Sequence, residues 1–141
     1  MTRLAPARHI LTILAVSDLR RCRGFYDAAF GWRVSEDVPV YVEYALPGGM
    51  LLGLYQREGF ARNTGVTPAT VPPGAITATE IYLRVEDLAE AADRLQAAGA
   101  RLLSRAAPRA WGDEAAYFAD PEGNVLVVAR PLPPEAGGSA R

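Results

Sequence analysis

The chain has 141 residues, of which 50% are hydrophobic, and a formal net charge of −1. This composition is typical of a folded chain with a core and excludes a disordered polymer. Charges of both signs are interspersed and no apolar run is long enough to span a bilayer, so neither a nucleic-acid nor a membrane partner is expected. The single cysteine, Cys22, excludes an intrachain disulfide, and we expect a cytoplasmic protein.

The first half of the chain predicts a β-α-β-β-β unit. An apolar strand over 10–16 precedes a helix whose apolar residues recur at helical spacing, and Gly31 stands where a left-handed residue ends a helix. Three further strands are expected over 34–37, 40–46 and 50–56, the last two joined by a Pro-Gly-Gly turn.

The second half predicts the same order of elements. A strand over 80–85 is followed by Asp87, whose carboxylate suits the N-cap of a helix, and Gly99 suits the end of that helix. Strands are then expected over 102–105, 115–119 and 125–130.

The two halves are copies of one unit. The stretch that begins at Leu14 recurs at Leu83, an offset of 83 − 14 = 69, and the proline turns at Pro47 and Pro121 recur at 121 − 47 = 74. The sequence therefore predicts an α+β fold of two tandem βαβββ modules. We expect the modules over 8–58 and 79–131, a linker or flap over 59–78 and a disordered tail over 132–141.

Three motifs stand out along the chain. They are a strand that ends in Leu-x-Val-x-Asp-Leu, beginning at Leu14 and again at Leu83, a helix that closes on Phe30-Gly31-Trp32, and the turn Asp120-Pro121-Glu122-Gly123-Asn124. These motifs resemble those of the vicinal oxygen chelate superfamily, which includes glyoxalase I, extradiol dioxygenases, and fosfomycin and bleomycin resistance proteins. The resemblance implies mixed sheets curled around a cup, often completed across a dimer, so a homodimer is expected.

The resemblance also locates the positions where metal-using members place their ligands. The repeat puts them at Leu11, Gly53, Glu80 and Val127. A single carboxylate does not satisfy a zinc or iron site, so we expect no metal and no cofactor. His9 is the only histidine and shares a strand face with Leu11, which leaves open an atypical site of His9 and Glu80.

The same positions and their neighbours are the candidate ligand-binding residues. Strand alternation places Tyr55 beside Gly53, where the small residue is expected to leave room for a bulky ligand. The full candidate set is Leu11, Tyr41, Glu43, Gly53, Tyr55, Glu80, Tyr82, Trp111 and Val127. Glu80 is the candidate general base, because a carboxylate in an apolar cup has its charged form disfavoured.

Three functions remain open from the sequence. The first is a metal-free protein that binds a small, partly aromatic or hydrophobic molecule, because aromatic rings with polar tips suit such ligands. The second is a metal-independent isomerase, epimerase or lyase with Glu80 as the base. The third is a glyoxalase-type or dioxygenase-type metal enzyme with a rearranged site.

Overall fold

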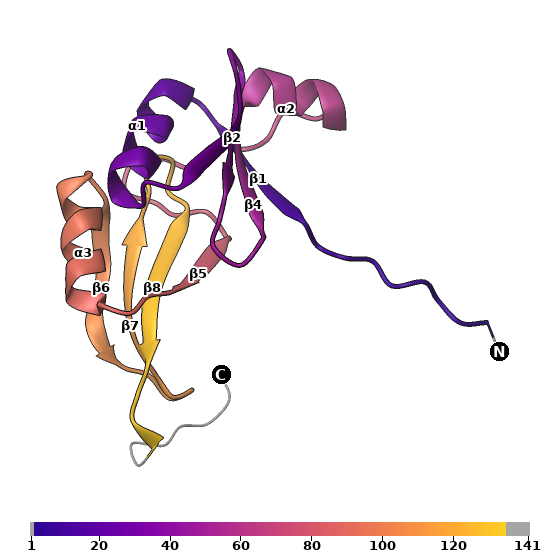
Figure 1. Cartoon of the computed structure of the whole chain (residues 1–141). Coiled ribbons are helices and arrows are strands. Elements are labelled where there is room, and N and C mark those ends of the chain that lie inside the picture. The colour runs from indigo at the N-terminus through magenta and orange to yellow at the C-terminus, as the bar shows by residue number, and fades with distance from the viewer. Residues whose placement is uncertain (1, 135–141) are drawn as a thin grey trace. The chain divides into compact units, whose positions relative to one another are not determined.

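The computed structural model describes residues 2–134, which form two compact units (Figure 1). Unit 1 consists of Met1–Leu19 and Trp32–Pro68, and unit 2 of Arg20–Gly31 and Ala69–Arg141. Each unit contains one four-stranded mixed sheet. Of the tail predicted over 132–141, residues 135–141 lie outside the described part of the chain.

The sheet of unit 1 has the strand order β1-β4-β3-β2, in which β1 and β4 are parallel and the other neighbours antiparallel. Burial alternates along its strands, because Val42, Tyr44, Leu52 and Leu54 are all buried while most residues between them are partly exposed. The strands are β1 (Leu11–Val16), β2 (Arg33–Val38), β3 (Tyr41–Ala45) and β4 (Leu51–Gln56).

Helix α2 (Arg57–Thr64) follows β4 directly and packs against β4 and β1. The sequence analysis placed the linker or flap from residue 59, so its first part is helical. The helix ends at Gly65, whose φ of 78° is left-handed and whose N–H donates to the Ala61 carbonyl over 2.8 Å.

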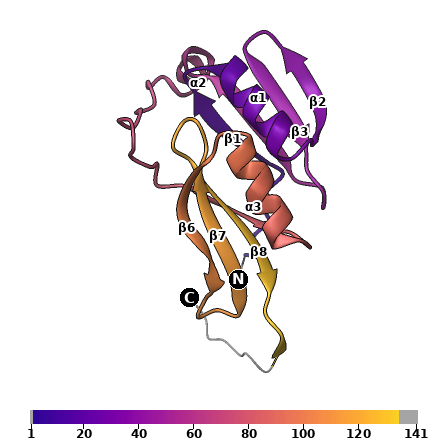
Figure 2. The ribbon, with the colours of Figure 1, turned by 90° about the vertical axis from the view of Figure 1, so that its left-hand side faces the viewer.

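Unit 2 repeats the arrangement with the strand order β5-β8-β7-β6. Helix α3 (Leu88–Ala97) lies along this sheet (Figure 2), and its Leu88 and Leu95 are buried, as are Phe118 and Leu126 of the sheet. Helix α1 (Leu19–Ala29) also belongs to this unit from Arg20 onward. The strands are β5 (Glu80–Arg84), β6 (Arg101–Pro108), β7 (Asp113–Ala119) and β8 (Val125–Pro131).

The strand register confirms the predicted repeat. Leu11 pairs with Leu51 in unit 1, and Glu80 pairs with Val125 in unit 2, so the offsets of 69 and 74 residues bring equivalent pairs together. Both sheets also carry a bulge at the same place, after Val34 in one and after Leu102 in the other. The α+β fold of tandem βαβββ modules is therefore confirmed.

The predicted helix signals are confirmed too. Gly31 and Gly99 have φ values of 62° and 106°, in the left-handed region that glycine adopts most readily. The Asp87 carboxylate accepts a hydrogen bond from the Glu90 N–H over 3.0 Å and so caps α3. No helix within residues 2–134 is both long enough and apolar enough to cross a membrane.

The turn between β7 and β8 is built around the buried carboxylate of Asp120. Its Oδ1 accepts the N–H groups of Glu122 and Asn124, each over 2.9 Å. Its Oδ2 accepts the Asn124 amide over 3.0 Å and the hydroxyl of Tyr26 from α1 over 2.6 Å. The turn motif therefore also holds α1 within unit 2, because a buried carboxylate needs its donors.

We expect Tyr26→Phe to lower the free energy of unfolding by about 2 kcal/mol, because the buried Asp120 carboxylate loses a donor. Urea unfolding measures this loss. Tyr117→Phe is the matched control and should change stability by less than about 0.5 kcal/mol, because no hydrogen bond involves its hydroxyl within the described residues. Equal stabilities of the two variants would contradict the role given to Tyr26.

Candidate functional site

Five of the predicted ligand-binding residues lie on one face of the unit 1 sheet. The register pairs Tyr41 with Tyr55 and Glu43 with Gly53, on the face opposite the buried Val42 and Leu54. Leu11 on β1 shares this face, because it pairs with Leu51, two residues before Gly53. The structure therefore brings the unit 1 candidates together, as strand alternation predicted.

The space beside Gly53 is filled by the ring of Tyr41. A Cβ atom added at Gly53 would lie 2.6 Å from Cε1 and 2.8 Å from Cζ of Tyr41. The sequence analysis expected this glycine to leave room for a ligand beside Tyr55. That expectation is wrong for the described structure, because the side chain on the neighbouring strand occupies the space.

Tyr41 and Glu43 form a polar centre on this aromatic face. The Tyr41 hydroxyl donates to Glu43 Oε1 over 2.7 Å, and the Ser35 hydroxyl donates to Oε2 over 2.9 Å. Burial of the phenol, together with the neighbouring Glu43 carboxylate, raises the pKa of Tyr41 well above its usual range. The phenol therefore stays a hydrogen-bond donor at all physiological pH values.

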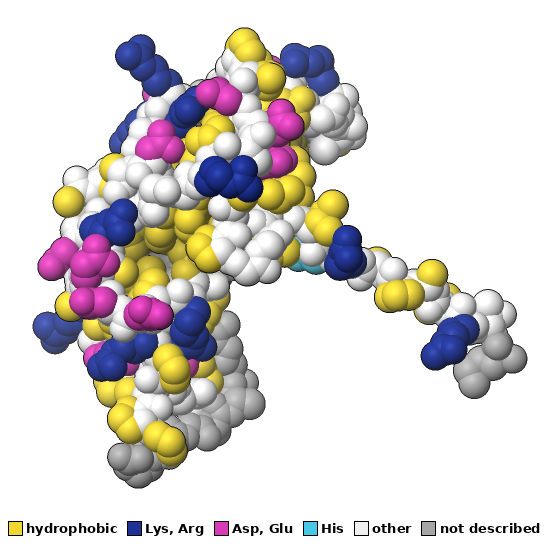
Figure 3. All heavy atoms as spheres, viewed as in Figure 1, with side chains coloured by type: hydrophobic (Ala, Val, Ile, Leu, Met, Phe, Trp, Pro, Cys, Tyr) yellow, Lys and Arg dark blue, Asp and Glu magenta, His cyan; other side chains and the backbone are white. Residues whose placement is uncertain are grey.

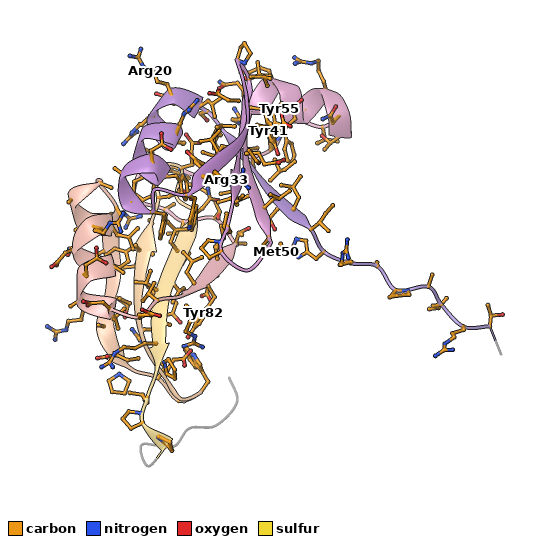
Figure 4. All side chains as sticks on the ribbon, viewed as in Figure 1. Arg20, Arg33, Tyr41, Met50, Tyr55 and Tyr82 are labelled. Atoms are coloured by element: carbon orange, nitrogen blue, oxygen red, sulfur yellow. The ribbon has the colours of Figure 1, made fainter. Side chains whose placement is uncertain are left out.

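Tyr55 joins this centre to helix α2. Its ring meets the Tyr41 ring edge to face with centroids 5.3 Å apart, and Figure 4 shows the two side chains next to α2. The Tyr55 ring also packs on Gly59 of α2, where an added Cβ would lie 2.8 Å from Cζ of Tyr55. Helix α2 therefore packs closely against the aromatic pair, and a larger residue at Gly59 would push it away.

Three of the unit 2 candidates, Glu80, Tyr82 and Val127, share one face of the sheet, which carries a buried apolar patch. Glu80 and Tyr82 alternate with Ile81 and Leu83 on β5, and Tyr82 pairs with Val127. The patch consists of the buried Ala115, Val125, Val127 and Ala129, with Tyr82, Leu103 and Tyr117 packed against them. Val127, a position where metal-using relatives are expected to carry a ligand, is thus part of a hydrophobic cluster.

A chain of hydrogen bonds crosses the edge of this patch. Trp111 Nε1 donates to the Tyr82 hydroxyl over 2.9 Å, and that hydroxyl donates to Asp113 Oδ2 over 2.5 Å. Arg84 Nη1 donates to Asp113 Oδ1 over 3.0 Å. Trp111 and Tyr82 were predicted as neighbours of the ligand, whereas sequence reasoning missed Asp113 and Arg84.

Arg109 borders the same patch. Its guanidinium lies 5.0 Å from the centre of the Tyr117 ring, a cation–π distance. Its Nη2 donates to the Ala115 carbonyl over 2.9 Å and to the Ser104 hydroxyl over 3.0 Å. Sequence reasoning missed this residue as well, because its partners lie on two other strand segments.

Glu80 is exposed in the described structure. Glu80 was expected to act as a base because an apolar cup would disfavour its charged form. The residues of unit 2 do not bury Glu80 in this way. Its role as a base stays a prediction.

The residues at the expected metal positions do not fit a metal ion. Leu11, Gly53 and Val127 carry no ligating atom, which leaves Glu80 alone. Within residues 2–134, no group of three or more His, Cys, Asp or Glu side chains is placed to hold an ion. The exposed His9 ring lies 2.9 Å from the Thr12 hydroxyl.

A groove of about 460 Å³ opens in unit 2 away from these residues. It lies at the start of α3 and is lined by Asp87, Leu88, Glu114 and Arg130 among others. Arg130 and Glu114, which are paired neighbours on β8 and β7, form an ion pair of 2.9 Å in its lining. None of the predicted ligand-binding residues lines this groove.

The fold described above defines a class of protein, in which tandem βαβββ modules contribute one four-stranded mixed sheet each. A family model described as a glyoxalase-like domain matches residues 12–129, and the chain belongs to this family. This membership confirms the predicted resemblance to the vicinal oxygen chelate superfamily. Comparison with curated proteins gives no significant match.

Solved structures support the same assignment. A glyoxalase-related enzyme from Fulvimarina pelagi is 25% identical, with a TM-score of 0.74 over 95% of this chain and 96% of that one. A glyoxalase/bleomycin resistance protein/dioxygenase from Nocardioides has the same fold, with 23% identity and a TM-score of 0.78 over 99% and 91% of the two chains. The protein ATC0852 from Agrobacterium tumefaciens is 27% identical, with a TM-score of 0.72 over 91% and 100%.

We expect Gly53→Ala to displace the Tyr41 ring and to lower the free energy of unfolding by about 1–3 kcal/mol, because the added methyl group overlaps that ring. In a Tyr41→Ala background the same change should cost less, and a double-mutant cycle of urea unfolding measures the coupling. Gly24→Ala is the control, because a Cβ there meets nothing within 4 Å in α1. Additive effects of the two substitutions would contradict the packing of Tyr41 on Gly53.

We expect Tyr41 to keep its proton when a folded sample is taken to pH ~10, the usual pKa of tyrosine. In the folded state the Tyr41→Phe variant should show the same tyrosinate absorbance as the unchanged protein up to that pH, because Tyr41 is not ionised there. After denaturation the variant should lose one sixth of the tyrosinate absorbance, because the chain has six tyrosines. A raised folded pKa stabilises the protein below the unfolded pKa of about 10, and this contribution is lost as the pH rises above it. Circular dichroism confirms that each sample is folded, and a reduced signal in the folded variant would contradict the raised pKa.

Proposed function

We propose that the chain binds a small, partly aromatic or hydrophobic molecule and that it does so without a metal ion. The observation that carries the proposal is the group of partly exposed rings on one face of the unit 2 sheet. The rings of Tyr82 and Tyr117 pack there on the buried apolar patch around Val127. Trp111 is tied to Tyr82 by a hydrogen bond and adds a third ring at the edge. Apolar surface with a few fixed polar tips is typical of small-molecule sites.

The unit 1 face supports the proposal through the same combination of side chains. Tyr41 and Tyr55 form an aromatic pair, and Glu43 supplies a carboxylate that two hydroxyl groups hold in place. A carboxylate held by its neighbours loses little conformational freedom when it receives a donor from a ligand. This face therefore offers stacking surface and one acceptor group.

The metal-free part of the proposal rests on the chemistry of the side chains. A divalent ion in a protein needs three or more nitrogen, sulfur or oxygen ligands. Of the four positions that the family resemblance points to, three carry Leu11, Gly53 and Val127, whose side chains have no donor atom. The homodimer and the cytoplasmic location stay predictions.

Binding of indole and 2-naphthol, followed by ligand-observed NMR in buffer with EDTA, tests this proposal. We expect saturable binding that weakens about tenfold in Trp111→Ala, because the variant loses an aromatic contact. Trp32→Phe is the control, since Trp32 packs against Tyr44 within unit 1 and should leave binding unchanged.

Two results would contradict the proposal. One is binding that EDTA abolishes and Zn²⁺ or Ni²⁺ restores, which would indicate a metal site. The other is the absence of saturable binding of either compound to a sample whose circular dichroism shows it to be folded.

A further inference from the structure

Arg84 ends β5 on the face that carries Tyr82. The two side chains lie two residues apart on the strand, and both bind the carboxylate of Asp113. The Arg84 side chain is 55% exposed, whereas that of Asp113 is only 11% exposed. The guanidinium therefore reaches solvent at the border of the apolar patch, while the group that holds it is buried.

The contacts of Arg84 use only part of its hydrogen-bonding capacity. Nη1 donates to Asp113, and no hydrogen bond within residues 2–134 involves Nε or Nη2. These two nitrogens form one edge of the planar guanidinium, with parallel N–H groups that match the two oxygens of a carboxylate. One complete bidentate edge is thus available to a ligand.

Asp113 fixes this edge in place. Its two carboxylate oxygens are held by Arg84 and by the Tyr82 hydroxyl, which in turn accepts a hydrogen bond from Trp111. A guanidinium held in one position loses less conformational entropy on binding than a freely rotating one. The same chain of contacts links the cation to two aromatic rings, so one ligand can reach both.

The charged side chains that border the patch are of both signs. Arg84, Arg109 and Glu80 lie at its edge, and the buried Asp113 carboxylate is bound by Arg84. Arg109 is held by the Ala115 carbonyl and lies against Tyr117. Arg84 therefore offers an anionic group one local cationic contact next to the rings.

We propose that this face of unit 2 binds an aromatic carboxylate, with the ligand carboxylate on the Nε and Nη2 edge of Arg84 and the ring against the partly exposed rings of Tyr82 and Trp111. The inference rests on the proposed binding of small aromatic molecules and adds the charge of the ligand. A carboxylate with two oxygens fits the single free edge, and the rings of Tyr82 and Trp111 add contacts for an aromatic ring that inorganic phosphate lacks.

Paired probes that differ only in charge test the inference. Indole-3-carboxylate and indole-3-carboxamide have nearly the same shape, and so do benzoate and benzamide. By NMR titration of the full chain we expect the carboxylates to bind at least about tenfold more tightly than the amides. In Arg84→Gln this preference should vanish while amide binding stays the same. Arg84→Lys should restore only part of it, because an ammonium group lacks the fork.

Arg20→Gln is the matched control, because it removes the same charge from an exposed residue of unit 2 that lies on helix α1 and points into solvent (Figure 4). It should keep the full preference for carboxylates. Inorganic phosphate added as a competitor should not displace indole-3-carboxylate at equal concentration.

The outcomes separate this inference from the proposed function. Equal binding of acid and amide, or a preference that survives Arg84→Gln, would overturn the role of Arg84 and leave aromatic binding standing. Binding of neither probe would overturn both. Displacement by equimolar phosphate would overturn the assignment of a carboxylate.

Discussion

Burial of one face of each sheet is the constraint on which the candidate site depends. Val42 and Leu54 in unit 1 are almost completely buried, so a shift of register by one residue would expose them to water. In unit 2, Leu126 and Val128 are buried on one face of β8 and Val125 and Val127 on the other. Strand alternation turns every second residue to the opposite face of each sheet, and most carboxylates and arginines lie at exposed or partly exposed positions because a buried face does not accept them. On the visible surface the charges of both signs are mixed (Figure 3).

Most of the fold could be predicted from the sequence because its signals are local or repeated. Strand alternation, the Asp87 cap and the glycines at 31 and 99 are each set by a few neighbouring residues. The offset between the copies then predicted which positions are equivalent in the two sheets. Helix α2 was missed, since its sequence carries Gly59 and ends in Asn63 and Thr64, which are weak helix formers, and its stability comes from packing on β4 and β1.

The contacts within the site could be predicted only in part. Alternation correctly placed Tyr82 and Val127 on one face, but it does not say which side chain fills a gap between strands. Tyr41 covers Gly53 because the register of β3 and β4 pairs Tyr41 with Tyr55, two residues from Gly53 on the same face, a relation that depends on pairing and not on spacing along one strand. Asp113 was missed for the same reason, since its partners lie 29 and 31 residues away.

The repeat also separates what the fold requires from what a ligand requires. Glu43 pairs with Gly53 in unit 1, whereas Tyr117 pairs with Val127 at the equivalent place in unit 2. Arg84 pairs with Ala129, and its equivalent in unit 1, which pairs with Tyr55, is Ala15. Both sheets fold with different residues at these positions, so folding alone does not explain a tyrosine, a carboxylate or an arginine there. The fold therefore does not require the hydrogen-bonded groups on these two faces, Tyr41 with Glu43 and Tyr82 with Asp113 and Arg84, and the proposed binding of a ligand would account for them.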